Sequence, residues 1–105
     1  MSAIRSIGVV GAGTMGNGIA QVFAQAGFNV YLQDTVLDAL DRARTTIEAS
    51  LARLVSKNIL HKDERDRTLE RLSTVRDLGA FSEVDYIVEA IIEDTDTKKK
   101  LFTAL

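Results

Sequence analysis

The stretch that decides the fold of this 105-residue chain is Gly11-Ala12-Gly13-Thr14-Met15-Gly16. Residues 4–10 before it form an apolar run with several β-branched side chains, which predicts a buried parallel strand. After it, apolar residues recur at three- and four-residue spacing and predict a helix from Met15 to Ala26, which Gly27 ends. The apolar face expected of this helix is Met15, Ile19, Val22, Phe23 and Ala26.

A second strand around Val30 and Leu32 is expected to end at Asp34. Strand, glycine turn, helix and strand then follow one another within about 30 residues, which is one βαβ unit. This order predicts an α/β fold, namely a partial Rossmann-type, doubly wound parallel sheet.

The rest of the chain predicts a helical hairpin and further strands. A helix is expected over residues 36–56, with an apolar stripe of Leu40, Ala43, Ile47, Leu51 and Leu54. A more polar helix from about His61 to Leu72 would complete a hairpin inserted into the sheet topology. Further expectations are a strand at 74–76, a turn or small helix at 77–83, a buried strand at 85–92 and a helix at 95–105.

Composition indicates a single globular domain and excludes several classes of function. The chain is 46% hydrophobic and 27% charged, with a net charge of -2 and no basic stripe, which argues against nucleic-acid binding. With no cysteine and one histidine, a metal site is not expected, and a reducing, cytoplasmic location is favoured. No stretch approaches the ~20 apolar residues of a membrane span, and no signal peptide is expected.

The glycines of the loop have separate physical roles. Gly11 permits the tight turn, Gly13 lets a pyrophosphate approach the backbone, and Gly16 allows close packing of helix on strand. The diphosphate would bind at the N-terminus of the helix, where unpaired N–H groups and the helix dipole favour negative charge.

Asp34 lies 18 residues after Gly16, where a carboxylate can accept hydrogen bonds from the adenosine ribose hydroxyls. Its charge would repel a 2′-phosphate, so NAD is favoured over NADP. One alternative is an acid that only caps the next helix, which predicts no cofactor preference. Another alternative is an FAD-binding domain, although in that class the second strand usually ends in glutamate.

Two segments carry a resemblance to a known family. Residues 11–21, which continue the loop with Gly18-Ile19-Ala20-Gln21, and residues 87–93, Ile-Val-Glu-Ala-Ile-Ile-Glu, followed by Lys98, closely resemble 3-hydroxyacyl-CoA dehydrogenases. The similarity is to the N-terminal NAD-binding domain, above all of bacterial 3-hydroxybutyryl-CoA dehydrogenases, and covers the entire chain.

The resemblance implies hydride transfer between NAD and C3 of a 3-hydroxyacyl-CoA. It implies NAD contacts from residues 11–16 and Asp34, together with Ala90, Glu93 and Lys98. Ser50 and Lys57 match positions that contact coenzyme A.

The same resemblance implies that the chain holds no catalytic residue. The family's catalytic histidine and the glutamate that orients it lie C-terminal to residue 105, as does its helical domain for substrate binding and dimerisation. His61 is instead expected to be a solvated residue at a helix start. Residues 1–105 would thus be a truncated NAD-binding domain of a homodimeric enzyme; the alternative is an NAD(H)-binding module without catalysis.

Overall fold

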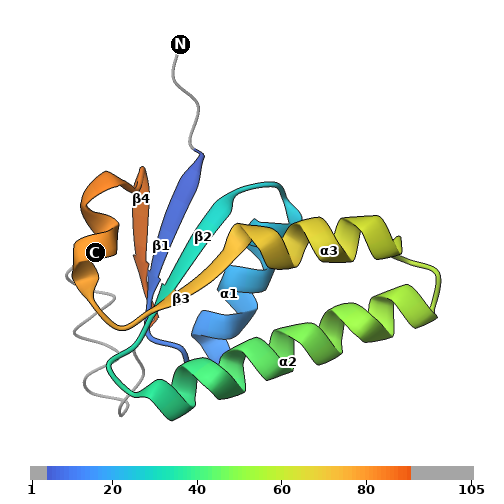
Figure 1. The fold of residues 1–105 in the computed structure, drawn as a ribbon, viewed down its shortest axis with the longest axis horizontal. Coiled ribbons are helices and arrows are strands. Elements are labelled where there is room, and N and C mark those ends of the chain that lie inside the picture. The colour runs from blue at the N-terminus through green and yellow to red at the C-terminus, as the bar shows by residue number, and fades with distance from the viewer. Residues whose placement is uncertain (1–4, 91–105) are drawn as a thin grey trace.

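The computed structural model describes residues 5–90, which form a four-stranded parallel sheet with the strand order β3-β2-β1-β4 (Figure 1). The elements are β1 (Ser6–Val10), α1 (Thr14–Gln25), β2 (Asn29–Gln33), α2 (Leu37–Ser56), α3 (Lys62–Arg71), β3 (Leu72–Val75), the 3-10 helix η1 (Leu78–Glu83) and β4 (Tyr86–Glu89). This is the Rossmann-type topology that the sequence predicts.

The sheet changes its direction of growth at β1, because β2 and β3 lie on one side of this strand and β4 lies on the other. Val10, the last residue of β1, pairs with Gln33 of β2 and with Glu89 of β4. The next residue of each strand, Gly11, Asp34 or Ala90, therefore lies at the same edge of the sheet. In open α/β sheets, ligands bind at this kind of topological switch point.

Helix α1 packs against the sheet through small residues, which corrects the face expected from the sequence. Its buried residues are Gly16, Ala20 and Ala24, at four-residue spacing. Met15, Ile19 and Phe23 pack only partly against the core, and Val22 is 65% exposed. The reason is distance: a helix that leaves β1 through a tight loop lies too close to the sheet for large side chains between them.

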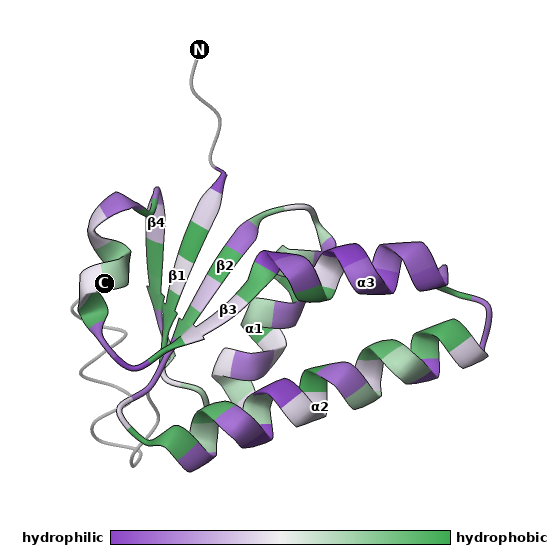
Figure 2. Cartoon of the chain, viewed as in Figure 1, coloured by the Kyte–Doolittle hydropathy of each residue, from purple (hydrophilic) through white to green (hydrophobic). Residues whose placement is uncertain are grey.

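The helical hairpin forms as predicted, with α2 and α3 side by side and running in opposite directions (Figure 1). The predicted stripe of α2 is buried at Leu40, Ala43, Ile47 and Leu51 and partly buried at Leu54. Figure 2 shows α3 as mainly hydrophilic, which agrees with the more polar helix predicted for this segment.

The turn of the hairpin begins at Asn58, which has a positive φ of 60°. The N–H groups of Asn58 and Ile59 donate to the carbonyls of Val55 and Leu54 at 3.0 and 2.9 Å, which is a Schellman motif. Asparagine tolerates the left-handed conformation better than other non-glycine residues. Residue 58 therefore ends α2 and directs the chain into α3.

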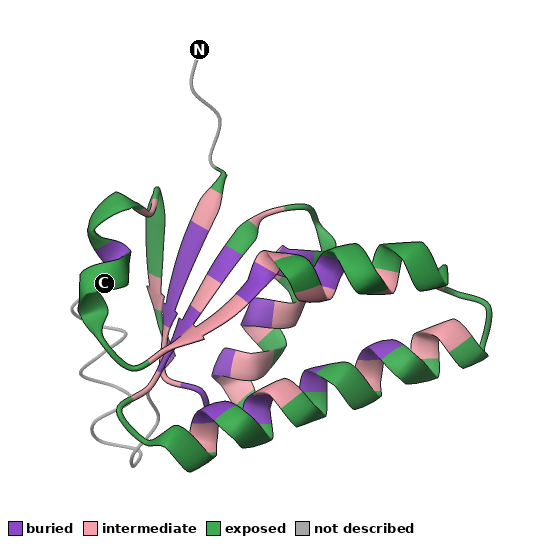
Figure 3. Ribbon diagram, in the orientation of Figure 1, coloured by how far each residue is buried: buried purple, intermediate pink, exposed green. Residues whose placement is uncertain are grey.

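Two strands differ from the expectation. Strand β3 begins at Leu72 rather than at residue 74 and follows α3 directly. Strand β4 is expected to be buried, but Tyr86 is 57% and Ile87 50% exposed (Figure 3). An apolar run does not reveal how many neighbours a strand has, and within residues 5–90 β4 is the edge of the sheet. The predicted positions 91–92 of this strand and the helix at 95–105 lie outside the described residues.

Asp85 ties the start of β4 to the start of β1. Its Oδ2 accepts hydrogen bonds from the backbone N–H of Arg5 at 2.8 Å and of Ser6 at 3.0 Å, and from the Ser6 hydroxyl at 3.3 Å. These bonds, led by that of the Arg5 N–H, lower the pKa of Asp85 from its ordinary value. The carboxylate, rather than the neutral acid, is therefore the form that stabilises this corner.

We expect Asp85→Asn to lower the free energy of unfolding at neutral pH and to leave it nearly unchanged in acid. A carboxylate whose pKa is lowered by folding stabilises the fold above its unfolded pKa of about 4. That contribution is lost as the pH falls through the lowered folded value. Urea unfolding at pH 7 and in steps to pH 2.5 measures the difference, with the exposed Glu83→Gln as control. An equal destabilisation at every pH would contradict the assignment.

Candidate cofactor-binding site

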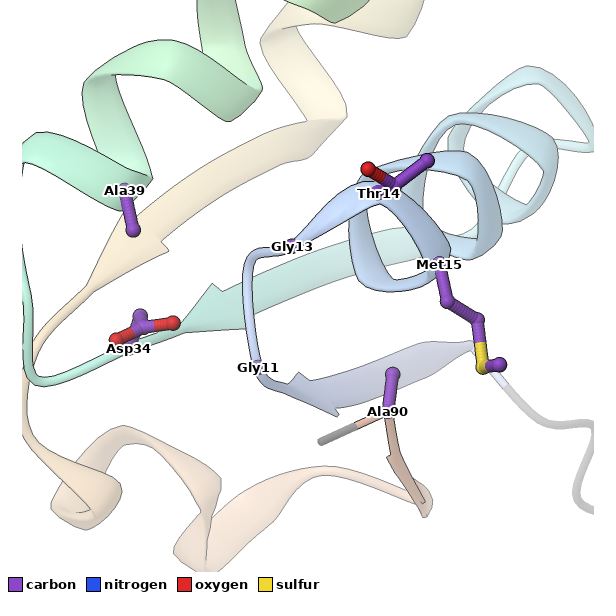
Figure 4. Close-up of a pocket in the computed structure, with 7 residues that line it drawn as sticks. All are labelled: Gly11, Gly13, Thr14, Met15, Asp34, Ala39 and Ala90. Carbon is purple, nitrogen blue, oxygen red and sulfur yellow. The ribbon is translucent and has the colours of Figure 1, made fainter. Parts of the chain in front are cut away.

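A pocket of about 420 Å³ opens at the C-terminal edge of the sheet, where β1, β2 and β4 end (Figure 4). Its lining residues are Gly11, Gly13, Thr14, Met15, Asp34, Ala39 and Ala90. The sequence predicts all of them except Ala39, which α2 brings to the rim beside Asp34. The signal for Ala39 was weak, because a small residue in the first turns of a helix has many ordinary uses.

The loop between β1 and α1 shows why glycine is needed at its start. Gly11 has a φ of 101°, a backbone conformation that is strained for every residue with a Cβ atom. Its N–H donates a hydrogen bond to the Gln33 carbonyl at 2.8 Å. At Gly13 an added Cβ would meet nothing within 4 Å, so the surface above this residue is open. The first N–H groups of α1 begin there and have no partner within the helix, which suits an anion.

At Gly16 the helix α1 passes so close to the glycine loop that there is no room for a side chain. A Cβ at this position would lie 1.7 Å from the carbonyl oxygen of Gly11 and 3.6 Å from the Cβ of Ala90. The distance to Ala90 would be an ordinary contact, so it is the glycine loop on which the first turn of α1 can rest only because residue 16 has no side chain.

Asp34 joins the glycine loop to the start of α2. Its Oδ2 accepts a hydrogen bond from the N–H of Ala12 at 3.0 Å, and its Oδ1 accepts one from the N–H of Val36 at 2.9 Å. The second bond closes a turn before α2, but the N-cap of this helix is Val36 and no side chain caps it, so the helix-capping alternative is not met. The first bond connects the same carboxylate to the glycine loop. Each carboxylate oxygen can accept a further hydrogen bond, so ribose hydroxyls and these two N–H groups can be bound together.

Arg76, the residue after β3, lies in this region although no sequence pattern marks it. Its guanidinium donates to the carbonyl of Thr35, the residue after Asp34, at 3.4 Å. Gln33 is buried and donates from Nε2 to the Arg76 carbonyl at 3.0 Å, which fixes the two strand ends together. A cation therefore lies close to the acid that is expected to select the cofactor.

The predicted coenzyme A residues lie on α2 and do not line this pocket. Ser50 is half-buried, and its hydroxyl accepts a hydrogen bond from Gln21 Nε2 at 2.9 Å. Lys57 is exposed and caps the C-terminus of α2. Glu93 and Lys98 lie outside the described residues.

His61 is exposed at the residue before α3, as predicted, and does not line the pocket. Within residues 5–90 no group of three metal-ligating side chains comes together. In the same part of the chain, no helix has the length and apolar character needed to cross a membrane.

Comparison with known proteins gives one consistent family. The family described as "3-hydroxyacyl-CoA dehydrogenase, NAD binding domain" matches residues 6–105. The 3-hydroxybutyryl-CoA dehydrogenase of Bradyrhizobium diazoefficiens is 38% identical over 104 residues, which cover 99% of this chain and 36% of that protein. A probable 3-hydroxybutyryl-CoA dehydrogenase of Deinococcus radiodurans is 45% identical over 98 residues, which cover 93% of this chain and 35% of that protein.

A solved structure agrees with these relatives. The (S)-3-hydroxybutyryl-CoA dehydrogenase PaaH1 of Ralstonia eutropha matches with a TM-score of 0.85 and 36% identity, over 97% of this chain and 36% of that one. The chain thus spans about a third of the length of the curated relatives that it matches, with shares of 36% and 35% in the two named above. The NAD-binding family also decides against the FAD alternative.

Proposed function

The chain belongs to the family of NAD-binding domains of 3-hydroxyacyl-CoA dehydrogenases, and we propose that it binds the cofactor in an enzyme of that activity. The enzyme would transfer a hydride between NAD and C3 of a 3-hydroxyacyl-CoA. One observation carries this proposal: the pocket combines a glycine loop, the N-terminus of α1 and the carboxylate of Asp34 at the switch point of the sheet.

We assign the parts of the pocket to parts of the dinucleotide. Residues 11–16, with the open N-terminus of α1, would bind the diphosphate, and Asp34 would accept hydrogen bonds from the adenosine ribose. Ala90 and Met15 give the pocket an apolar side below the loop, and we propose that Glu93 and Lys98 complete this side. When bound, NAD supplies the hydride acceptor.

The substrate and the remaining machinery are also proposals. Ser50 and Lys57 would contact the coenzyme A of the acyl-CoA from the flank of α2. The catalytic histidine, its glutamate and a helical domain that forms a homodimer would lie in sequence after residue 105. The cysteine-free composition supports a cytoplasmic location.

A second candidate function is that of an NAD(H)-binding module without turnover, for the 105-residue chain by itself. It is favoured because the described lining of the pocket holds no titratable side chain other than Asp34, which we assign to the adenosine ribose. The lone histidine lies elsewhere, at the start of α3.

Titration with NADH, followed by an assay of acetoacetyl-CoA reduction, separates these functions. We expect the 105-residue chain to bind NADH saturably, to bind NADPH more weakly and to reduce no acetoacetyl-CoA. Turnover by this chain would overturn the assignment of catalytic residues to sequence beyond it. Failure to bind NADH, with folding confirmed by circular dichroism, would overturn the cofactor function.

A further inference from the structure

Gln21 has no role in the cofactor pocket, although it ends the motif Gly18-Ile19-Ala20-Gln21. It lies on α1, is half-buried, and faces α2. Its Nε2 donates to the Ser50 hydroxyl at 2.9 Å and to Oε1 of Gln25 at 3.0 Å. A side chain of the helix that begins at the cofactor loop is therefore bonded to a residue proposed to contact coenzyme A.

The direction of this hydrogen bond determines what Ser50 can offer a ligand. An amide NH₂ group only donates, so the Ser50 oxygen is the acceptor and its own O–H hydrogen is directed elsewhere. Within residues 5–90, Ser50 Oγ donates to no protein oxygen, and this hydroxyl is only partly buried. The hydrogen of this hydroxyl is therefore available to an acceptor oxygen of a ligand.

The positive charges along the same side of α2 favour a ligand whose acceptor oxygen is negatively charged. Arg53 and Lys57 follow Ser50 by three and seven residues, so the three side chains lie within one side of the helix. Both cations are exposed, and α2 has no acid from residue 49 to its end. Phosphate oxygens, which accept hydrogen bonds and carry negative charge, fit this combination of one fixed donor and two cations.

We propose that Gln21 is a positioning residue for acyl-CoA, which holds the Ser50 hydroxyl as a donor toward a phosphate oxygen of the coenzyme. This inference rests on the function proposed above. Gln21 acts through Ser50, without contact with the reacting atoms.

The test uses the complete enzyme that carries this domain, with acetoacetyl-CoA and saturating NADH. We expect Gln21→Met, which keeps the volume but cannot donate, to raise the acetoacetyl-CoA KM roughly 3- to 10-fold with kcat and the NADH KM unchanged. The inhibition constant of free coenzyme A should rise by the same factor. Gln21→Glu should be worse, by more than about tenfold, because Ser50 would then donate to the new carboxylate and turn its lone pairs toward the phosphate.

Ser50→Ala and the double variant Gln21→Met/Ser50→Ala complete the design. Because Gln21 acts through Ser50, the double variant should match Ser50→Ala alone. Gln25→Glu adds the same charge one turn further along α1, keeps the acceptor for Gln21 and should change the KM less than about twofold.

The possible failures are distinct. A Ser50→Ala variant with unchanged acetoacetyl-CoA KM would show that the proposed coenzyme A contact is wrong. A raised KM for Ser50→Ala but not for Gln21→Met, a Gln21→Glu variant no worse than Gln21→Met, or additive effects in the double variant would overturn the positioning role alone. Thermal melts confirm that each variant is folded when assayed.

Discussion

Gly16→Ala is expected to abolish NAD binding and to destabilise the domain by more than about 3 kcal/mol, beyond the ordinary cost of overpacking. The new Cβ would lie 1.7 Å from the Gly11 carbonyl oxygen, and backbone atoms cannot rotate away as a flexible side chain can. Relief requires either α1 to move off the sheet or the loop to move. Either movement displaces the N–H groups that would bind the diphosphate.

Gly18→Ala is the matched control, two residues later on the same helix. A Cβ at Gly18 would meet nothing within 4 Å. Alanine is the better helix former, so this variant should be more stable by roughly 0.5–1 kcal/mol and should bind NADH as before. Urea unfolding and NADH fluorescence titration of both variants provide the measurements. If the two replacements have similar effects, the close approach at Gly16 does not limit the site.

The local part of the fold could be predicted from the sequence because its signals are local. The glycine loop, the strand before it and the acid after the next strand are spaced by the geometry of a single βαβ unit. The apolar stripe of α2 could be predicted equally well, because apolar residues recur every three or four positions along a long helix with one buried side. These features also place Gly11 and Asp34 at one edge, whereas Ala90 reaches that edge through the long-range pairing of β4 with β1.

The errors concern contacts between elements that are distant in the chain. The large apolar residues of α1 predict its buried face, and this prediction is wrong. The tight loop brings the helix so near the sheet that the small residues Ala20 and Ala24 fill the space between them. The exposure of Ile87 depends on which strands flank β4. No pattern within either segment reports on such neighbours.

Gly8, in the middle of β1, is another residue whose long-range contact cannot be predicted from its own segment. In the sequence it is an unremarked residue of the apolar run at 4–10. In the structure, an added Cβ would lie 2.8 Å from Cε2 of Phe81, because η1 places this ring against β1. Only the fold shows that the glycine makes room for an aromatic side chain more than seventy residues later.

Asp34→Ala is expected to weaken NADH binding by about 10- to 150-fold, the effect of losing one charge-assisted hydrogen bond of roughly 1.5–3 kcal/mol. NADPH binding should weaken less or improve, because the carboxylate that repels the 2′-phosphate is gone. Arg76 remains bonded to the Thr35 carbonyl, and we expect its charge to attract this phosphate. The ratio of the two dissociation constants is therefore the decisive quantity.

Three further variants separate the contributions of Asp34. Asp34→Asn keeps one acceptor oxygen for the loop or for α2 but loses the charge, so it should lose NADH affinity less than Asp34→Ala. Asp38→Asn removes an exposed charge from the first turn of α2 and should leave both affinities unchanged. Arg76→Ala, combined with Asp34→Ala, should remove the relative gain in NADPH binding.

The measurements are fluorescence titrations with NADH and NADPH, made at least ten degrees below each melting temperature. This precaution matters because Asp34→Ala also removes the bonds from the N–H groups of Ala12 and Val36 and should lower the melting temperature. If the NADH affinity and the preference for NADH over NADPH are both unchanged, Asp34 only stabilises the turn before α2. A lower melting temperature together with a shifted NADH-to-NADPH ratio would show that one carboxylate both fixes the glycine loop and selects the cofactor.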